Sequence, residues 1–122
     1  QALVAQAREF TSESGIRVSF VAKGKCGLDR AIDAELFRIT QQALTNVQQH
    51  ANAQAVTVTL ACTKRNVRLT IADDGSGFDP RRVSPDRHGI VGMRERARVA
   101  GGSLRIVSGR SKGTRVVATV PA

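Results

Sequence analysis

The chain has 122 residues, 41% of them apolar, and a formal net charge of +9. This length fits one domain with its own core, and no apolar run approaches the roughly 18 residues of a membrane-spanning helix. No export leader opens the sequence. Because it starts at Gln1, we expect a piece of a longer polypeptide, whose parent can still be a membrane protein.

The positive charge has several interpretations. Basic residues are spread from Arg8 to Arg115, and there is no Trp or Tyr to stack on bases. A solvated arginine-rich surface and a polyanionic ligand such as a nucleoside triphosphate both fit this distribution. A nucleic-acid-binding domain is less favoured, and steep salt dependence of binding would identify it.

The two cysteines, Cys26 and Cys62, stand far apart, and the two histidines do not complete a metal-ligand spacing with them. We therefore expect two buried free thiols of a cytosolic domain and no zinc site.

In chain order, the first half predicts a helix, a strand and a long helix. Apolar residues share one helical face from Leu3 to Phe10, and Gly15 ends that helix. A strand is predicted over 16–21. Apolar residues at three-to-four spacing then predict an amphipathic helix over 33–51, with Asp33 as its N-cap.

The second half predicts two hairpins separated by a polar loop and a short helix. The alternating segments 56–60 and 67–71 form the first hairpin, with its turn around 64–66. A helix over 93–100 ends at Gly101 and Gly102. The segments 104–107 and 116–120 form the second hairpin.

This order predicts one domain over residues 1–122 with an α+β fold. Alternating strands suit a sheet with one covered face. We expect a two-layer α/β sandwich, in which a mixed sheet of about five strands is covered on one face by about three helices.

A polar stripe borders the apolar face of the long helix. Gln42, Asn46 and Gln49 are four and three residues apart, which places them on one side. Such a stripe is often only the wet face of a helix. An asparagine oxygen, however, also suits Mg²⁺, which takes phosphate oxygens and water as further ligands.

Two glycine-containing segments follow strands or precede helices. Asp73–Gly77 lies where a predicted strand ends. A carboxylate in such a place can accept the hydrogen bond that an adenine amino group donates, and glycines let the backbone approach a flat ligand closely. Asp-Gly is also ordinary turn chemistry. Gly89–Gly92 precedes the short helix, whose N-terminus favours anions. We expect Arg94 and Arg96 in its first turn.

Together, in this order, these segments resemble the ATP-binding domain of two-component sensor histidine kinases, and most closely the subfamily of nitrate/nitrite and membrane-fluidity sensors. The stretch Arg38–Val47, with His50 and Ala51, resembles the N box. Asp73–Gly77 resembles the first glycine box, His88–Ala97 the second and Gly113-Thr114 the last. The likeness extends over essentially the whole chain.

The resemblance implies the Bergerat-type fold shared with gyrase, heat-shock chaperone and mismatch-repair ATPases, with ATP and Mg²⁺ as cofactors. Asn46 would hold the metal, Asp73 would receive the adenine amino group, and Asp79–His88 would be a mobile lid. The implied catalytic residues are Asn46 and Gln42. The implied nucleotide-binding residues are Asn46, His50, Asp73, Gly75, Gly77, Gly89, Ile90, Gly92, Met93, Gly113 and Thr114.

Two positions depart from the family pattern. Gln42 stands where the family usually has Glu, and an amide cannot serve as a general base. Gln49 stands where Lys is common, which removes one expected phosphate contact. Both changes bear on phosphoryl transfer more than on nucleotide binding.

The implied function is transfer of the ATP γ-phosphate to a histidine on upstream dimerisation helices outside this chain, for relay to a response regulator. The alternative is a catalytically weak or non-catalytic ATP-responsive regulatory module, because of Gln42. A serine kinase of the anti-sigma-factor type shares the fold, but residues 93–97 argue against it. We expect a monomeric, cytoplasmic domain without nucleic-acid or membrane contact.

Overall fold

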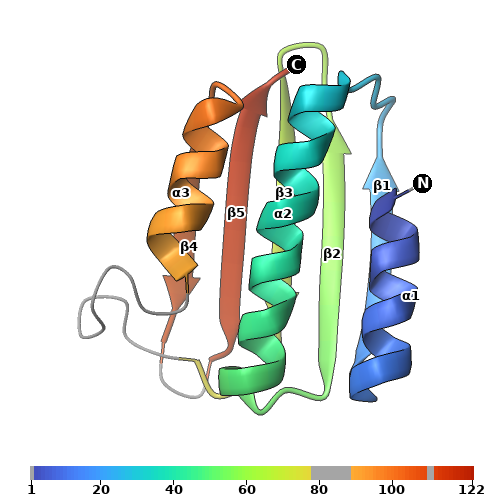
Figure 1. Ribbon diagram of the computed structural model, residues 1–122, viewed down its shortest axis with the longest axis vertical. Helices are drawn as coiled ribbons and strands as arrows, with labels where there is room; N and C mark the ends of the chain where they lie inside the picture. The colour runs from blue at the N-terminus through green and yellow to red at the C-terminus, as the bar shows by residue number, and fades with distance from the viewer. Residues whose placement is uncertain (1, 78–88, 110–111) are drawn as a thin grey trace.

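A computed structural model describes residues 2–77, 89–109 and 112–122 (Figure 1). The expected lid, Asp79–His88, lies outside the described residues. The helices are α1 (Ala2–Ser14), α2 (Arg30–Asn46) and α3 (Ile90–Val99), and α2 continues into one π-helical turn, η1 (Val47–Ala51). None of the described helices is both long and apolar enough to cross a membrane.

Five strands form one mixed sheet in the order β1-β2-β3-β5-β4. The strands are β1 (Arg17–Lys23), β2 (Ala55–Cys62), β3 (Asn66–Asp73), β4 (Ser103–Ser108) and β5 (Thr114–Pro121). The β1–β2 pair is parallel and the other pairs are antiparallel. All three α-helices cover one face of the sheet, so the predicted two-layer sandwich is confirmed (Figure 1).

The alternating sequence of the central strands fixes which side chains enter the core. In the β2–β3 register, Val58 lies opposite Ile71 and Leu60 opposite Leu69, and all four are buried. Their neighbours in sequence face away from the helices and are partly exposed or, like Arg68, exposed. A one-residue slip would reverse this arrangement, so burial of one face specifies the register.

The core lies between the sheet and helix α2. Leu36 and Ile39 of α2 are fully buried, and Met93 and Ala97 bring α3 into the same cluster. Full burial of a large aliphatic side chain contributes about 1.5–3 kcal/mol. Packing of this apolar stripe therefore holds α2 on the sheet. It also fixes which α2 side chains face the end of the sheet where β3 stops.

Two predicted helix starts are wrong. Helix α2 begins at Arg30 because Asp29 is its N-cap: the Asp29 carboxylate accepts a hydrogen bond from the Ile32 N–H at 2.8 Å. The predicted cap, Asp33, lies inside the first turn. Helix α3 begins at Ile90, so Arg94 lies beyond its first turn and Arg96 lies in its last turn, where a cation stabilises the helix dipole.

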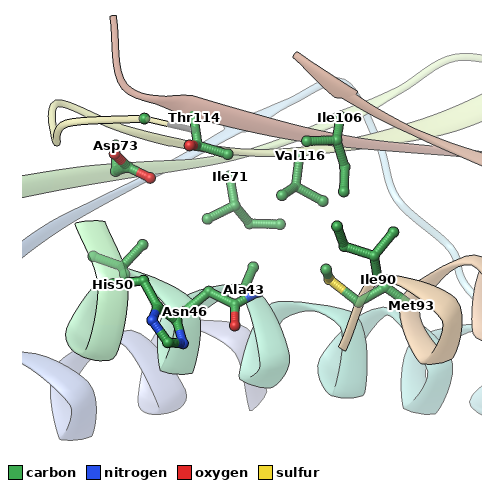
Figure 2. Close-up of a pocket in the computed structure, with 12 residues that line it drawn as sticks. Ala43, Asn46, His50, Ile71, Asp73, Ile90, Met93, Ile106, Thr114 and Val116 are labelled. Atoms are coloured by element: carbon green, nitrogen blue, oxygen red, sulfur yellow. The ribbon is translucent and has the colours of Figure 1, made fainter. Parts of the chain in front are cut away.

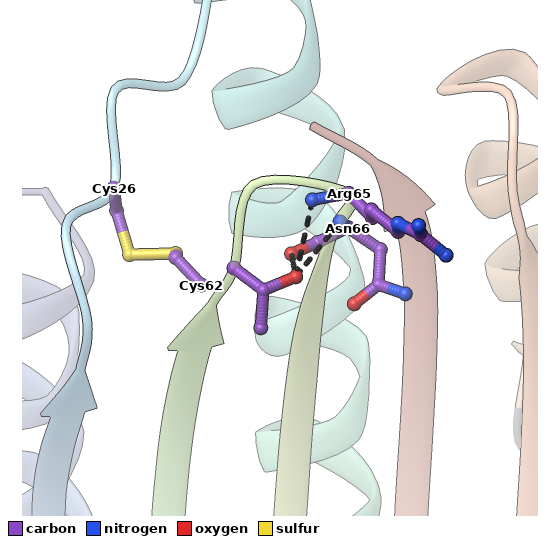
Figure 3. Close-up of a disulfide and its surroundings, with 5 residues drawn as sticks. Cys26, Cys62, Arg65 and Asn66 are labelled. Carbon is purple, nitrogen blue, oxygen red and sulfur yellow. Dashed lines mark hydrogen bonds between the residues drawn. A yellow bond between two sulfur atoms is a disulfide. The ribbon is translucent and has the colours of Figure 1, made fainter.

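The expectation of two free thiols is also wrong, because Cys26 and Cys62 form a disulfide (Figure 3). Parallel pairing places Lys23 at the end of β1 opposite Ala61, next to the end of β2. The chain leaving β1 therefore passes Cys62, and the two Cα atoms lie 5.4 Å apart, within disulfide reach. Only this pairing of distant segments brings the two cysteines together.

Candidate functional site

A pocket opens between the helical layer and the sheet where β3 ends and β5 begins (Figure 2). It encloses about 570 Å³, including the space at its open mouth. Apolar residues line its walls: Ala43, Val47, Ile71, Ile90, Met93, Ile106 and Val116. Asn46, His50, Asp73, Gly77 and Thr114 complete the lining. The sequence-predicted residues Asn46, His50, Asp73, Gly77, Ile90, Met93 and Thr114 therefore meet in one pocket.

Asp73 is a half-buried carboxylate at the end of β3. Its burial raises the pKa, while hydrogen bonds from the Gly75 and Thr114 backbone partly oppose that rise and the nearby Asp74 charge adds to it. The Gly75 N–H donates to Asp73 Oδ1 at 2.8 Å. This bond gives predicted Gly75 a place in the site, because it orients the carboxylate that faces the pocket (Figure 2).

Asp74 has a different task from its neighbour, which the sequence did not reveal. Its Oδ1 accepts hydrogen bonds from the backbone N–H groups of Gln54 at 2.9 Å and Ala55 at 3.1 Å. These bonds lower its pKa. Asp74 therefore ties the loop after β3 to the start of β2, and this fixes the position from which Asp73 points.

Two glycines allow the loops around Asp73 to approach each other. Gly77 and Gly113 have φ of +69° and +74°, a region that favours glycine. A Cβ on Gly77 would lie 2.1 Å from the Gly109 carbonyl oxygen, and one on Gly113 would lie 2.2 Å from the Asp73 carbonyl oxygen. Any side chain there would push the β4–β5 loop away from the pocket edge. Predicted Gly113 thus shapes the site through its backbone.

Asn46 and His50 reach the pocket from the end of the long helix (Figure 2). Between them the helix widens into the π turn η1, and Asn52, with φ of +52°, ends it in the left-handed conformation. Single π turns recur at functional sites, because they redirect side chains without breaking the helix. The sequence predicted a regular helix here, since a π turn has no recognisable periodicity over five residues.

Gln42 contacts both Asn46 and the loop before α3. Its Nε2 donates to Asn46 Oδ1 at 3.1 Å, with the amide orientations assigned from the hydrogen bonding. Gly89 has φ of +65°, and a Cβ there would lie 2.4 Å from Gln42 Cδ. The Gln42 side chain therefore packs against the Gly89 backbone and orients the Asn46 oxygen.

A second, more polar hollow adjoins the pocket and shares Met93 with it. Its other lining residues are Arg38, Gln41, Gln42, Thr45, Gly89, Gly92 and Arg96. The first turn of α3 lies here, so backbone N–H groups and two guanidinium groups gather at one place. Predicted Gly92 lines this hollow, whereas Gln49 lines neither cavity and is exposed.

Arg38 and Arg96 were missed as site residues. Arg38 lies one turn before Gln42 on the same helix face, which is the signal that could have identified it. Arg96 is paired with Glu35 at 3.5 Å, across the α2–α3 contact. Within the described ranges, no three His, Cys, Asp or Glu side chains gather closely enough to hold a metal ion.

Comparison with known sequences identifies relatives of this chain. Residues 31–122 match the family described as histidine kinase-, DNA gyrase B-, and HSP90-like ATPase. Over 94 residues the chain is 37% identical to the sensor histidine kinase LiaS of Bacillus subtilis, covering 77% of this chain and 26% of that protein. Over 116 residues it is 33% identical to the signal transduction histidine-protein kinase/phosphatase DegS of Brevibacillus brevis, covering 93% and 30%.

Solved structures support the same fold. The ATP binding domain of PrrB from Mycobacterium tuberculosis aligns with a TM-score of 0.81 at 23% identity, covering 99% of this chain and 91% of that one. The Erythrobacter litoralis EL346 blue-light activated histidine kinase aligns with a TM-score of 0.78 at 22% identity, covering 98% and 40%. The chain spans between 26% and 30% of the two sequence relatives. It belongs to the family of histidine kinase-, DNA gyrase B- and HSP90-like ATPases.

Proposed function

We propose that this chain is the ATP-binding catalytic domain of a sensor histidine kinase. It holds ATP so that the γ-phosphate reaches a histidine on dimerisation helices elsewhere in the parent protein. The phosphoryl group then passes from that histidine to a response regulator. When bound, ATP supplies the phosphoryl group. The residues of this chain bind ATP, orient its phosphates and neutralise their charge. Positioning and charge neutralisation are most of what catalysis of phosphoryl transfer requires.

The observation that carries the proposal is the half-buried Asp73 carboxylate in an apolar pocket. Purine rings need flat apolar surfaces, and Ile71, Ile106 and Val116 supply these from the sheet. A carboxylate among them accepts a hydrogen bond from an amino group, so it favours adenine over guanine, whose corresponding position is a carbonyl. Gly77 lines the pocket, and the close packing of the loops at Gly77 and Gly113 holds backbone at its edge.

The polar hollow suits the phosphates. Arg38 and the first turn of α3 place positive charge beside the pocket, and Arg96, although paired with Glu35, adds a guanidinium group to its lining. Asn46 Oδ1 lies at the boundary and is the protein ligand that we assign to Mg²⁺. Phosphate oxygens and water would supply the remaining ligands, as is usual for this ion.

Gln42 supports the alternative, an ATP-responsive module with little or no kinase activity. Its amide cannot accept a proton at neutral pH. It also donates to Asn46 Oδ1, the same oxygen that we assign to Mg²⁺. We therefore expect nucleotide binding in either case and slow transfer in this chain.

The first test is calorimetric titration with a non-hydrolysable ATP analogue, with and without Mg²⁺, and with the GTP analogue as comparison. Asp73→Asn should weaken ATP binding by at least about 1 kcal/mol, because it replaces an acceptor with a possible donor in a partly closed site. Asp33→Asn, which makes the same change at the far end of α2, is the matched control. Equal affinity of wild type and Asp73→Asn would refute the adenine assignment.

The second test separates the two functional alternatives. Gln42→Glu removes the donor to Asn46 and adds a carboxylate, so transfer to a supplied phosphoacceptor domain should increase if the kinase assignment holds. The control is Gln48→Glu, which makes the same charge change at an exposed position that lines neither cavity. If neither variant nor wild type transfers phosphate while all bind ATP, the regulatory module is the correct function.

A further inference from the structure

The disulfide lies at the end of the sheet opposite the pocket. Cys62 ends β2 and lies opposite Val67, whereas Asp73 lies opposite Val56 at the other end of the same strand pair. Cys26 is exposed, while Cys62 is only 9% exposed. A reagent in solution therefore reaches the Cys26 sulfur and is largely excluded from the Cys62 sulfur.

The disulfide is the main link between residues 24–28 and the sheet. Among the described residues, no hydrogen bond joins this segment to another part of the chain. Gly24 has φ of +80° and passes so close to β2 that a Cβ would lie 2.1 Å from the Cys62 carbonyl oxygen. Leu28 packs on the core edge. Breaking the bond would leave the segment held only by these van der Waals contacts.

The charged side chains nearest the two cysteines in sequence are mainly positive. Lys23 and Lys25 closely precede Cys26, and Lys64 closely follows Cys62; all three are exposed. Neither Lys23 nor Lys25 forms an ion pair with any carboxylate of the described part of the chain. The nearest acid in sequence, Asp29, is engaged by the Ile32 N–H. An approaching anion therefore meets unpaired cations, which increase its local concentration.

We propose that the Cys26–Cys62 bond is a thiol-exchange site that reacts preferentially with small anionic thiols, of which glutathione is the test case. A thiolate attacks Cys26 Sγ, the bond between Cys26 and Cys62 breaks, and Cys62 leaves as a thiolate that takes a proton from water. A second thiolate attacks the outer sulfur of the mixed disulfide. This step releases Cys26 as a thiol and one oxidised disulfide, so two thiols lose the two electrons that the protein gains.

In the folded state, the expected consequence is local. Among the described strands, β1 pairs with β2 alone, so loss of the cross-link loosens the 24–28 segment and the end of β1 first. The nucleotide pocket, at the opposite end, keeps its geometry. Reduction should therefore increase amide exchange in residues 20–28 while leaving binding of the ATP analogue unchanged within about twofold.

The test measures exchange rates of the oxidised 122-residue chain with glutathione, neutral 2-mercaptoethanol and cationic cysteamine, corrected for thiolate fraction. At low salt we expect roughly 3- to 10-fold faster reaction with glutathione than with cysteamine, and little preference in high salt. Lys23→Gln/Lys25→Gln should remove the preference. Arg105→Gln/Arg115→Gln, with the same loss of charge toward the other sheet edge, should retain it.

Mass spectrometry of briefly treated protein should locate the glutathione adduct on Cys26. Three results would overturn the proposal: two free thiols in air-oxidised protein, an adduct on Cys62, or the same thiol preference in both double variants. Circular dichroism of each variant confirms that its fold is intact before rates are compared.

Discussion

At one end of the sheet, β2 leads into β3 through the short turn 63–65. Thr63 Oγ1 accepts hydrogen bonds from the N–H groups of Arg65 and Asn66 in this turn. The Cys26–Cys62 disulfide holds the neighbouring segment (Figure 3). At the other end, β3 terminates in Asp73 and continues into a loop that contains Gly75 and Gly77. The same strands thus have one closed end and one open end.

The difference separates stability from binding. At the closed end, local polar groups bond to one another and a covalent link limits the unfolded chain. At the open end, the Asp73 carboxylate is partly buried, which raises its pKa and disfavours its charged form. Glycines there hold backbone conformations that other residues avoid. Substitutions at the two ends should therefore affect different properties.

The largest effect is expected from Gly113→Ala at the open end. Its Cβ would lie 2.2 Å from the Asp73 carbonyl oxygen in a backbone conformation with positive φ, so the loop must move. We expect a loss of about 3 kcal/mol or more in the free energy of unfolding and loss of ATP binding. Urea unfolding and calorimetry measure the two effects.

Gly92→Ala is the control for stability, because nothing outside its own helix backbone and its chain neighbours lies within 4 Å of the Cβ position. Gly92 lies in the first turn of α3, so alanine there should stabilise the protein by less than the roughly 1 kcal/mol expected in a helix interior. Equal stability of the two variants would show that the close approach at Gly113 is not required.

Reduction of the disulfide tests the closed end. The cross-link joins residues 36 positions apart. In the chain-entropy description, removing a link of this span lowers the free energy of unfolding by about 3–4 kcal/mol. Urea unfolding of Cys26→Ser and of the reduced wild type should agree, and reducing agent should not destabilise Cys26→Ser further. A reduced chain as stable as the oxidised one would contradict this account.

The neighbouring aspartates should respond to pH in opposite directions. The folded-state pKa of Asp73 is raised, so its ionisation destabilises the fold, and this penalty is relieved as pH falls through that pKa toward 3.8. The pKa of Asp74 is lowered, so its stabilisation is present above 3.8 and is lost as pH falls through the folded value. At neutral pH, Asp73→Asn should therefore raise the thermal midpoint, and Asp74→Asn should lower it.

The pH dependence of binding gives the smallest signal and the most specific one. Affinity for the ATP analogue should fall as acid protonates Asp73, by at most tenfold per pH unit, since one proton blocks one acceptor. Asp73→Asn should lose this dependence, apart from the contribution of the ligand's own titration. An identical pH profile in both proteins would assign the titrating group elsewhere.

Much of this arrangement is local and was predictable. Alternation over 56–60 and 67–71 predicts both central strands, because a half-buried strand repeats every two residues. Apolar spacing predicts α2, because a helix buries one stripe. The family resemblance, carried by boxes such as Asp73–Gly77, predicted residues that line the pocket, among them Asp73 and Gly77.

The tertiary structure decided what depends on segments far apart in sequence. Asp29 and Asp33 are both suitable N-cap residues for α2, and their positions in the sequence alone do not show which of them caps the helix. The packing of Gln42 against Gly89 requires the contact of α2 with α3, and the disulfide requires parallel pairing of β1 with β2. Sequence by itself determined elements whose hydrogen bonds and burial repeat along the chain. Contacts between distant elements have no such period, so only the folded chain specifies them.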